Sequence, residues 1–321
     1  MTVPVVLSAC KQYPGTHFTM LTSKMGEKIY RAVMGDTPNL TVRGVNLKKD
    51  YKGIWGLNRL FRKLKREKFD AVVDLHDVLR TKWLRFRFKL RGTPMAVIDK
   101  GRSEKKALVA HTLDKQLKTS VQRYLETFEK VGLPVTIDYD ARAIAERFQP
   151  HIQESEALAI GIAPFAQHAG KIYPKEQMQS VIRLLLAAEP DAHIYLFGGP
   201  DEQAELDVWA SQDENHIHNI AGRQAIGDDV ALMAQLDCIV TMDSANMHLA
   251  SLVGTRVVSI WGATHPKAGF FGFRQQESDI ISLPLDCRPC SIYGNKPCQH
   301  GDYRCLTGIQ PQTIVDKVLN L

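Results

Sequence analysis

Residues 239–266 decide the fold of this chain. They read Ile-Val-Thr-Met-Asp-Ser-Ala-Asn-Met-His-Leu-Ala-Ser-Leu-Val-Gly-Thr-Arg-Val-Val-Ser-Ile-Trp-Gly-Ala-Thr-His-Pro. The β-branched run over 238–241 predicts a buried strand, 246–253 predict a helix that Gly254 ends, and 256–261 predict a second strand. Ligands of parallel α/β sheets bind at the carboxyl ends of the strands. The stretch therefore predicts a ligand site that draws on Asp243, Ser244, Asn246, His248, Gly262 and Thr264.

The start of the predicted helix has two interpretations. Its free backbone N–H groups and partial positive charge suit a phosphate or a sugar hydroxyl, and Asp243 could accept hydrogen bonds from a polyol. Alternatively, Asp243 or Ser244 is an ordinary helix cap. The residues alone support both interpretations equally.

The rest of the chain alternates strands with helices. We predict strands at 17–21, 40–45, 69–75, 95–98, 157–163, 193–197 and 217–220, besides the two above. We predict helices at 2–13, 24–33, 54–68, 78–89, 121–131, 177–188, 202–211, 228–235 and 313–321. This order predicts parallel sheets with helices on both faces. Residues 100–118 are expected to form a loop with some helix. Residues 135–156 read as a linker, so the predicted domains are 1–150 and 151–321.

The composition is that of a globular protein. The 321 residues are 44% hydrophobic and 24% charged, and this length favours two domains. No apolar run approaches the roughly 20 residues that span a bilayer, and no signal peptide is visible. We therefore expect a cytoplasmic protein.

The net charge of +6 is unevenly distributed. Residues 1–140 hold 28 Lys and Arg against 14 Asp and Glu, whereas the remainder holds 13 against 21. The basic residues concentrate between Lys48 and Arg91, which favours a polyanion or an anionic membrane surface as partner over an ordinary solvated surface. A nucleic acid is the least favoured partner, because the chain has no recognisable RNA- or DNA-binding module.

The segment from Asp243 to Thr264 resembles a segment of a known protein family. Asp-Ser-Ala-Asn-Met-His-Leu-Ala, followed by Gly-Thr-Arg-Val-Val-Ser-Ile-Trp-Gly-Ala-Thr, resembles the donor-site segment of the ADP-heptose:lipopolysaccharide heptosyltransferases, glycosyltransferase family 9. The likeness extends over most of the chain. It implies an α/β fold of the GT-B type, with two Rossmann-like doubly wound parallel-sheet domains facing a central cleft. The N-terminal domain would bind the acceptor and the C-terminal domain the nucleotide-sugar.

The resemblance also implies an activity. It is inverting transfer of a heptose, or a related sugar, from an ADP-sugar donor to the inner core of lipopolysaccharide, with no cofactor. The enzyme would work at the inner face of the inner membrane, as a peripheral protein. The alternatives are a catalytically impaired homologue that still binds the nucleotide-sugar and, less favoured, a nucleic-acid-binding protein.

The donor-site prediction rests on matches to the family pattern. Lys171 before Tyr173-Pro174 matches a family Lys-x-Trp/Tyr-Pro segment whose Lys contacts donor phosphate, although the residues alone read as a surface Lys near a turn. The predicted donor-binding residues are Lys171, Gly198, Gly199, Glu202, Asp243, Ser244, Ala245, His248 and Thr264. The predicted acceptor-binding residues are Arg62, Lys63, Arg85 and Arg87.

The first residues depart from the family pattern. Family members carry an apolar strand and a Gly-Asp turn before the helix equivalent to 2–13, and the Asp of that turn is regarded as the general base. No residue here matches it, so we expect a misassigned or truncated start, a gap between the strands at 17–21 and 69–75, and a poorly stable, nearly inactive chain. Asp77, beside His76, is the substitute candidate for the base.

Four cysteines crowd the C-terminal end. Cys287, Cys290, Cys298 and Cys305 follow the pattern C-x₂-C-x₇-C-x₆-C, which could hold a structural zinc ion. A cytoplasmic location disfavours disulfides, and free thiols are the favoured interpretation. No metal is expected in the transfer reaction itself.

Overall fold

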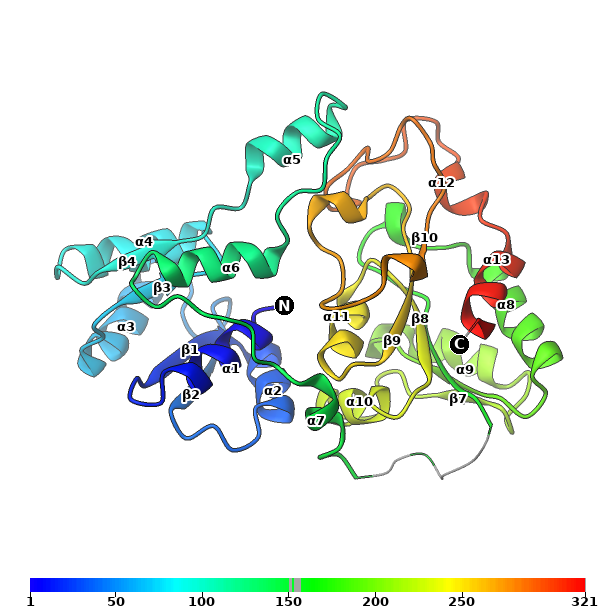
Figure 1. Ribbon diagram of the computed structural model, residues 1–321, viewed down its shortest axis with the longest axis horizontal. Helices are drawn as coiled ribbons and strands as arrows, with labels where there is room; N and C mark the ends of the chain where they lie inside the picture. The colour runs from blue at the N-terminus through cyan, green and yellow to red at the C-terminus, as the bar shows by residue number, and fades with distance from the viewer. Residues whose placement is uncertain (150–151, 153–156, 321) are drawn as a thin grey trace. The chain divides into compact units, whose positions relative to one another are not determined.

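The computed structural model describes residues 1–149, 152 and 157–320, and Figure 1 shows its ribbon. It divides into two compact units. Met1–Arg102 and Lys118–Tyr139 form the N-terminal unit, and Ser103–Leu117 and Asp140–Leu321 form the C-terminal unit. The predicted boundary between residues 150 and 151 lies outside the described residues and stays a prediction.

The N-terminal unit contains two separate parallel strand pairs. Its elements are α1 (Val3–Gln12), β1 (Phe18–Ser23), α2 (Lys24–Val33), β2 (Leu40–Val45), α3 (Gly53–Leu64), β3 (Val72–Asp74), α4 (Leu79–Lys89), β4 (Met95–Val97) and α6 (Ser120–Glu129). β1 pairs with β2 and β3 pairs with β4, each pair forming its own two-stranded sheet. Within the described part of the chain, β1 and β3 are therefore each bonded along one edge only.

The helices α3 and α4 of this unit pack on each other through aromatic and aliphatic side chains. Leu60, Phe61 and Leu64 of α3 form one buried cluster with Leu84 and Phe88 of α4. The rings of Phe61 and Phe88 meet edge to face, with centroids 5.0 Å apart. Such contacts hold the two helices together.

The C-terminal unit is built on a six-stranded parallel sheet in the order β10-β9-β8-β5-β6-β7. Its strands are β5 (Ala159–Ala163), β6 (His193–Leu196), β7 (Ile217–Asn219), β8 (Cys238–Met242), β9 (Arg256–Ile260) and β10 (Ile280–Ile281). Its helices are α5 (Arg102–Val109, whose first residue belongs to the other unit), α7 (Ala141–Ala145), α8 (Lys175–Ala188), α9 (Gln203–Ala210), α10 (Ile226–Met233), α11 (Ala245–Leu252), α12 (Arg304–Thr307) and α13 (Pro311–Leu319).

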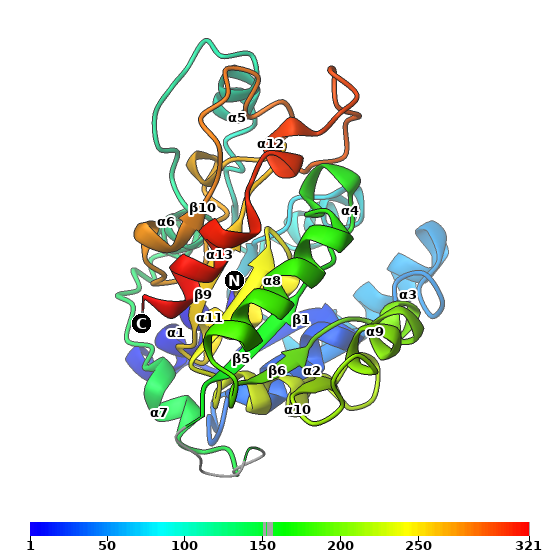
Figure 2. The same cartoon turned by 90° about the vertical axis from the view of Figure 1, so that its right-hand side faces the viewer.

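Helices cover both faces of this sheet. Figure 2 shows α8 and α13 side by side in front of the strands, and Figure 1 shows α10 and α11 on the opposite side. Every residue of β5 and β8 is buried, as expected for central parallel strands. Arg256 forms a two-pronged ion pair with Asp279 and also donates to the backbone of α13, which fastens the β10 edge of the sheet.

Residues 103–117 belong to the C-terminal unit because of their packing. Leu108 and Leu117 are buried against Ala268, and the Leu117 N–H donates to the Lys267 carbonyl at 2.9 Å. The segment predicted as a loop with some helix thus contains α5 and lies on the second unit.

The predicted fold class and element order are confirmed. Most differences lie at element ends, and β10 and α12 are elements that the sequence does not predict. The strand predicted at 69–75 is only three residues long, and the helix predicted to reach residue 68 ends at Leu64 and tightens into a 3₁₀ turn at Lys65–Glu67. Lys68 then adopts φ 52°, which no helix can continue through. Within the described residues, no helix is long and apolar enough to cross a membrane.

Candidate functional site

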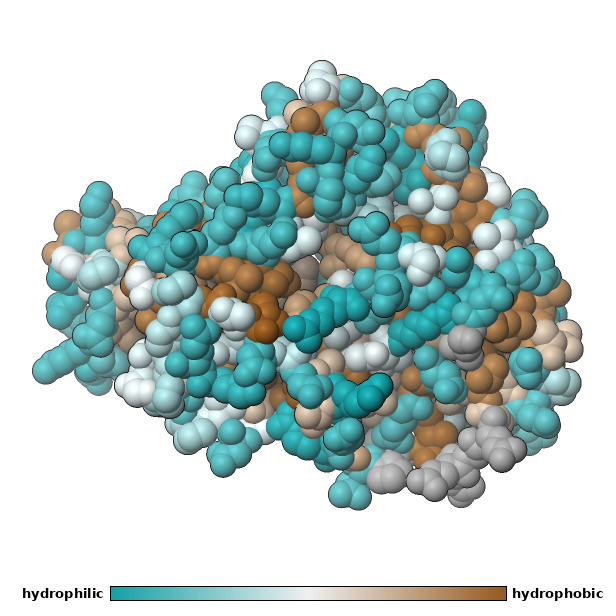
Figure 3. Space-filling view, in the orientation of Figure 1, coloured by the Kyte–Doolittle hydropathy of each residue, from teal (hydrophilic) through white to brown (hydrophobic). Residues whose placement is uncertain are grey.

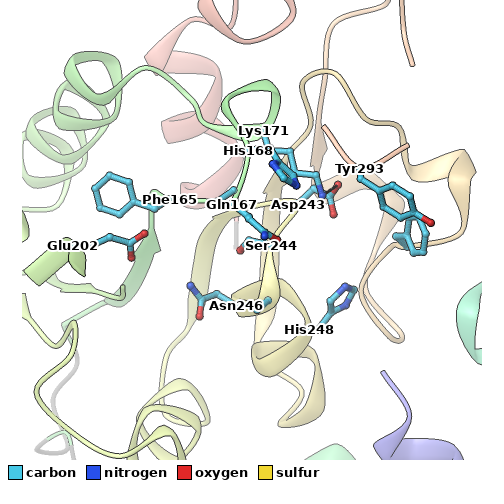
Figure 4. A pocket seen from close by; sticks show the side chains of 13 residues that line it. Phe165, Gln167, His168, Lys171, Glu202, Asp243, Ser244, Asn246, His248 and Tyr293 are labelled. Carbon is cyan, nitrogen blue, oxygen red and sulfur yellow. Dashed lines mark ion pairs between the residues drawn. The ribbon is translucent and has the colours of Figure 1, made fainter. Parts of the chain in front are cut away.

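A cavity of about 580 Å³ opens at the carboxyl ends of β5, β6 and β8 in the C-terminal unit. The residues after β5, the 3₁₀ turn after β6 and the first turn of α11 supply most of its wall, and Figure 4 shows their side chains converging on it. The lining residues are Phe165, Ala166, Gln167, His168, Lys171, Glu202, Asp243, Ser244, Ala245, Asn246, His248, Phe270 and Tyr293. This volume is within the range for small-molecule sites, roughly 300–1,000 Å³.

The centre of the cavity carries an ion pair. Lys171 Nζ lies 2.8 Å from Asp243 Oδ2, and the two side chains are 15% and 6% exposed. An ammonium group has three N–H donors, so Lys171 can keep this contact and still donate to a ligand in the cavity. The predicted residues Lys171 and Asp243 are therefore brought together, 72 positions apart in the sequence.

The first turn of α11 is open toward the cavity. Ser244 occupies the N-cap position, but its side chain makes no capping hydrogen bond and lies 3.2 Å from Thr241 Oγ1. Asp243 is engaged with Lys171, so the alternative that either side chain caps the helix is wrong. A helix start without a side-chain cap leaves N–H donors for an anion.

The Lys171 loop is positioned by backbone packing. The carbonyl of Gly170 accepts from the Ala263 N–H at 2.8 Å. A Cβ on Gly262 would lie 2.6 Å from that same carbonyl oxygen, and a Cβ on Gly294 would lie 2.6 Å from Lys171 Cγ. Gly262 and Gly294 therefore allow two other loops to approach this one more closely than a side chain would permit.

The loop after β9 is held by a buried arginine. The Arg288 guanidinium donates to the carbonyls of Trp261, Gly262 and Thr264 at 2.6–3.0 Å. Burial lowers the pKa of Arg288, but neighbouring carbonyl dipoles satisfy its donors. This arginine was not among the predicted site residues. It acts by shaping the backbone that packs behind Lys171.

Glu202 and the two glycines lie together at one end of the cavity. Glu202 Oε2 accepts from the Gly199 N–H at 2.6 Å, and a Cβ on Gly198 would lie 2.8 Å from the same oxygen. Figure 4 places Glu202 and Phe165 on one side and Tyr293 on the other. The predicted set Gly198, Gly199 and Glu202 is thus one local structure, with the carboxylate lining the cavity.

His248 and Thr264 each carry a buried polar atom without a protein partner. These atoms are His248 Nδ1 and Thr264 Oγ1. Burial, aided by the charge of Lys171, lowers the pKa of His248 to about 3, so the imidazole is neutral at physiological pH. His248 lines the cavity, whereas Thr264 is not among the lining residues and its carbonyl accepts from Arg288. A neutral His can offer one hydrogen bond to a ligand but no positive charge.

Some lining residues carried no sequence signal strong enough to predict them. Phe165, Gln167, His168 and Phe270 come from irregular loops, where neither periodicity nor a motif marks them. Tyr293 lies within the cysteine-rich segment, and its ring packs on Phe270 with centroids 5.9 Å apart. Its position between Cys290 and Cys298 was the one signal that could have found it.

The N-terminal unit gathers the predicted Asp77 and Arg85 into one charged cluster. Asp77 contacts Arg85 at 3.1 Å and Arg102 at 2.8 Å, and Arg85 also lies 3.3 Å from Asp74. Burial raises the pKa of Asp77, but Arg102, Arg85 and Lys82 outweigh it and the net pKa is lowered. Asp77 is therefore ionised and engaged. A base is most effective when its pKa is near the working pH.

The other predicted acceptor residues lie on α3 and α4. Arg87 donates to the Asn58 side chain at 2.7 Å and lies over the Phe61 ring. Lys63 donates to the Tyr51 hydroxyl at 3.3 Å, and Arg62 is exposed. Arg62, Lys63, Arg85 and Arg87 are thus spread over two helices, and none of them lines the cavity that contains Lys171.

The four C-terminal cysteines are free thiols. Cys287 and Cys290 line a second cavity of about 570 Å³, together with His111 and His300. Across the residues that the structure describes, no group of three or more His, Cys, Asp or Glu side chains is placed to hold a metal ion. The zinc hypothesis for Cys287, Cys290, Cys298 and Cys305 gains no support from this geometry.

Comparisons with known proteins point to one family. The family model described as glycosyltransferase family 9 (heptosyltransferase) matches residues 57–299. Lipooligosaccharide heptosyltransferase 2 of Campylobacter jejuni is 20% identical over 331 residues, covering 100% of this chain and 94% of the relative. Lipopolysaccharide core heptosyltransferase OpsX of Haemophilus influenzae is 22% identical over 284 residues, covering 82% and 75%.

A solved structure supports the same architecture. The structure of the E. coli heptosyltransferase WaaC with ADP superposes with a TM-score of 0.68 at 18% identity, covering 99% of this chain and 94% of that one. At this identity the likeness establishes the fold, which is the GT-B type with Rossmann-like units.

Proposed function

Because this chain belongs to glycosyltransferase family 9, the heptosyltransferases, we propose that it transfers a heptose or a related sugar from an ADP-sugar to an inner-core hydroxyl of lipopolysaccharide. The observation that carries the proposal is the Lys171–Asp243 pair at the open start of α11, inside the 580 Å³ cavity.

The lining chemistry suggests how the donor lies. Glu202 is a carboxylate that can accept from ribose hydroxyls at one end of the cavity. Lys171 and the first N–H groups of α11 would bind the diphosphate at the centre. The sugar would then reach toward His248 and Tyr293, on the side away from Glu202.

In the proposed reaction an acceptor hydroxyl attacks the anomeric carbon as the bond to the diphosphate breaks, which inverts the configuration. A base takes the hydroxyl proton, and ADP leaves with the bonding electron pair. Negative charge grows on the leaving phosphate, where Lys171 and the α11 N–H groups stabilise it. Asp243 holds the Lys171 ammonium in place for this role.

Asp77 stays the candidate base, and Arg62, Lys63, Arg85 and Arg87 the candidate acceptor contacts. The lowered pKa of Asp77 makes it a weak base. A carboxylate within a basic surface nevertheless suits the orientation of a hydroxyl beside an anionic sugar. We further propose that the protein works in the cytoplasm, as a peripheral protein on the inner membrane, and that nucleic acid is not its partner.

The test compares two lysine variants of the full chain. Lys171→Gln should weaken ADP binding about tenfold in calorimetry and lower the rate of heptose transfer about 100-fold, in line with the loss of one charge-stabilising donor. Lys267→Gln is the control, because Lys267 pairs with Asp114 and does not line the cavity.

Two results would contradict the proposal. One is ADP binding by Lys171→Gln that equals the wild type, with both proteins melting at the same temperature. The other is a wild-type chain that binds ADP but transfers no sugar to a lipopolysaccharide core acceptor, which is the outcome expected for the impaired homologue.

A further inference from the structure

Helix α4 carries two apolar faces. Leu84 and Phe88 are buried in the cluster with α3, 9% and 5% exposed. A second row of apolar side chains recurs at i, i+4, i+7 and i+11 and consists of Leu79, Trp83, Phe86 and Leu90. Leu79, Phe86 and Leu90 are 84%, 50% and 68% exposed. The helix therefore presents an apolar stripe to the solvent, opposite its packed face.

Basic residues flank this stripe on both sides. At about 3.6 residues per turn, Arg80 and Arg87 fall on one flank, and Lys82 and Lys89 fall on the other. No Asp or Glu occurs anywhere from Val78 to Ile98. A partner surface that covers the stripe therefore meets positive charge along both edges, and the charge complement is an anionic surface.

The neighbouring helix α3 adds exposed apolar groups. Trp55 is 83% and Ile54 48% exposed at the start of α3. Asn58, one turn after Trp55, accepts from Arg87 of α4 at 2.7 Å, so the two helices meet here. In Figure 3, some hydrophobic residues lie among hydrophilic ones over the part of the molecule where Figure 1 labels α3 and α4.

This combination is typical of helices that lie in a membrane interface. Such helices place Trp, Phe and Leu on one face and Lys and Arg beside it, where long basic side chains reach the lipid headgroups. We infer that α4 lies in the plane of an anionic bilayer, with Leu79, Phe86 and Leu90 inserted among the lipids and Arg80, Lys82, Arg87 and Lys89 at the headgroups. The inference rests on the proposed function for the membrane as the place of work, and it names the segment that docks there.

The experiment measures binding of the full chain to vesicles. Sedimentation with phosphatidylcholine vesicles, with and without phosphatidylglycerol, should show binding of the wild type only when the anionic lipid is present. The triple variant Leu79→Asn, Phe86→Asn, Leu90→Asn should bind at least tenfold more weakly. The matched control is Met25→Asn with Val208→Asn, which removes apolar groups of 55% and 65% exposure elsewhere and should bind as the wild type does.

Salt separates the two contributions to binding. Raising ionic strength from 0.1 M to 1 M shortens the Debye length from about 10 Å to about 3 Å and should weaken wild-type binding severalfold. Equal vesicle binding by the triple variant and the wild type would overturn the inference. A triple variant that changes only the oligomeric state, with unchanged vesicle binding, would overturn it as well, because the stripe would then be a contact between copies.

Separate measurements keep this inference apart from the proposed function. The triple variant should retain the wild-type affinity for ADP and should transfer heptose to a water-soluble, delipidated core acceptor at the wild-type rate. If the wild type transfers no heptose but binds vesicles through the stripe, the proposed function is wrong and the inference stands. If transfer is normal but vesicle binding does not depend on the stripe, only the inference fails.

Discussion

The parallel strands of the two units differ in how deeply their residues are buried. In the C-terminal unit, β5 and β8 are buried at every residue and lie inside a continuous six-stranded sheet. In the N-terminal unit, five of the six residues of β1 are half-buried and the sixth is exposed, and the strands form two separate pairs. The same alternation of strands and helices in a sequence therefore does not fix how much of each strand is covered.

The charged clusters of the two units also differ in how far their members are exposed to solvent. Lys171 and Asp243 are enclosed at a cavity whose walls are fixed by backbone contacts. Asp77 is nearly as covered, but its partner Arg102 is 64% exposed. We therefore expect the C-terminal site to be rigid and sensitive to small changes of shape. The N-terminal cluster should respond weakly, and mainly to charge.

The largest expected effect comes from substitutions that compare a deeply buried strand residue with a half-buried one. Ile160→Ala in β5 removes a fully buried side chain from the main core and should lower the free energy of unfolding by about 4 kcal/mol. Leu21→Ala in β1 removes a half-buried side chain from the smaller cluster and should cost about 1.5 kcal/mol. Urea unfolding followed by circular dichroism measures both values. Equal losses would show that the strands of the two units depend on burial to the same extent.

Much of the fold was predictable from the sequence, because the hydrophobic periodicity of a long segment indicates which of its residues are buried. The helix at 24–33 and the strand at 40–45 match the structure at both ends. The sequence does not predict β10, because two residues are too few to show a hydrophobic periodicity. It does not predict the early end of α3 either, because no residue before Lys68 signals the positive φ of Lys68.

The site residues that could be predicted are those whose polar side chains follow a strand closely in the sequence. Lys171, Glu202 and Asp243 each come soon after a strand of the central sheet, and all three line one cavity. Phe270 could not be predicted, since an irregular loop brings it to the cavity, and the cysteines around Tyr293 are the one sequence signal near that residue. The pairing of Asp77 with Arg102 is likewise a product of tertiary packing, because 25 positions separate the two residues.

A smaller effect should come from the close packing of Gly294 against the Lys171 side chain. Gly294→Ala and Gly301→Ala both place a side chain at positive φ, 73° and 76°, and should each cost about 1–2 kcal/mol of stability. Only the Cβ at residue 294 would press on Lys171, at 2.6 Å from its Cγ, whereas residue 301 faces open space. Gly294→Ala should therefore weaken ADP binding about tenfold while Gly301→Ala leaves it unchanged. Calorimetry that finds equal affinities would show that the Lys171 position is not fixed by this contact.

The smallest expected effect concerns Asp77. Asp77→Asn removes the charge that Arg85 and Arg102 contact, and because Arg102 is largely exposed the loss at pH 7 should be below about 1 kcal/mol. The pKa of Asp77 is lowered in the folded state, so its contribution is present above the ordinary value of 3.8 and is lost as the pH falls through the lower folded value. The stability difference between wild type and variant should thus stay constant from pH 8 to pH 5 and vanish only in stronger acid. Asp138→Asn is the control, since Asp138 is 60% exposed in its pair with Lys11 and should contribute almost nothing. A difference that disappears near pH 6 would mean that the Asp77 carboxyl gains protons far more readily than its two arginines allow, and would make it a stronger base than its surroundings indicate.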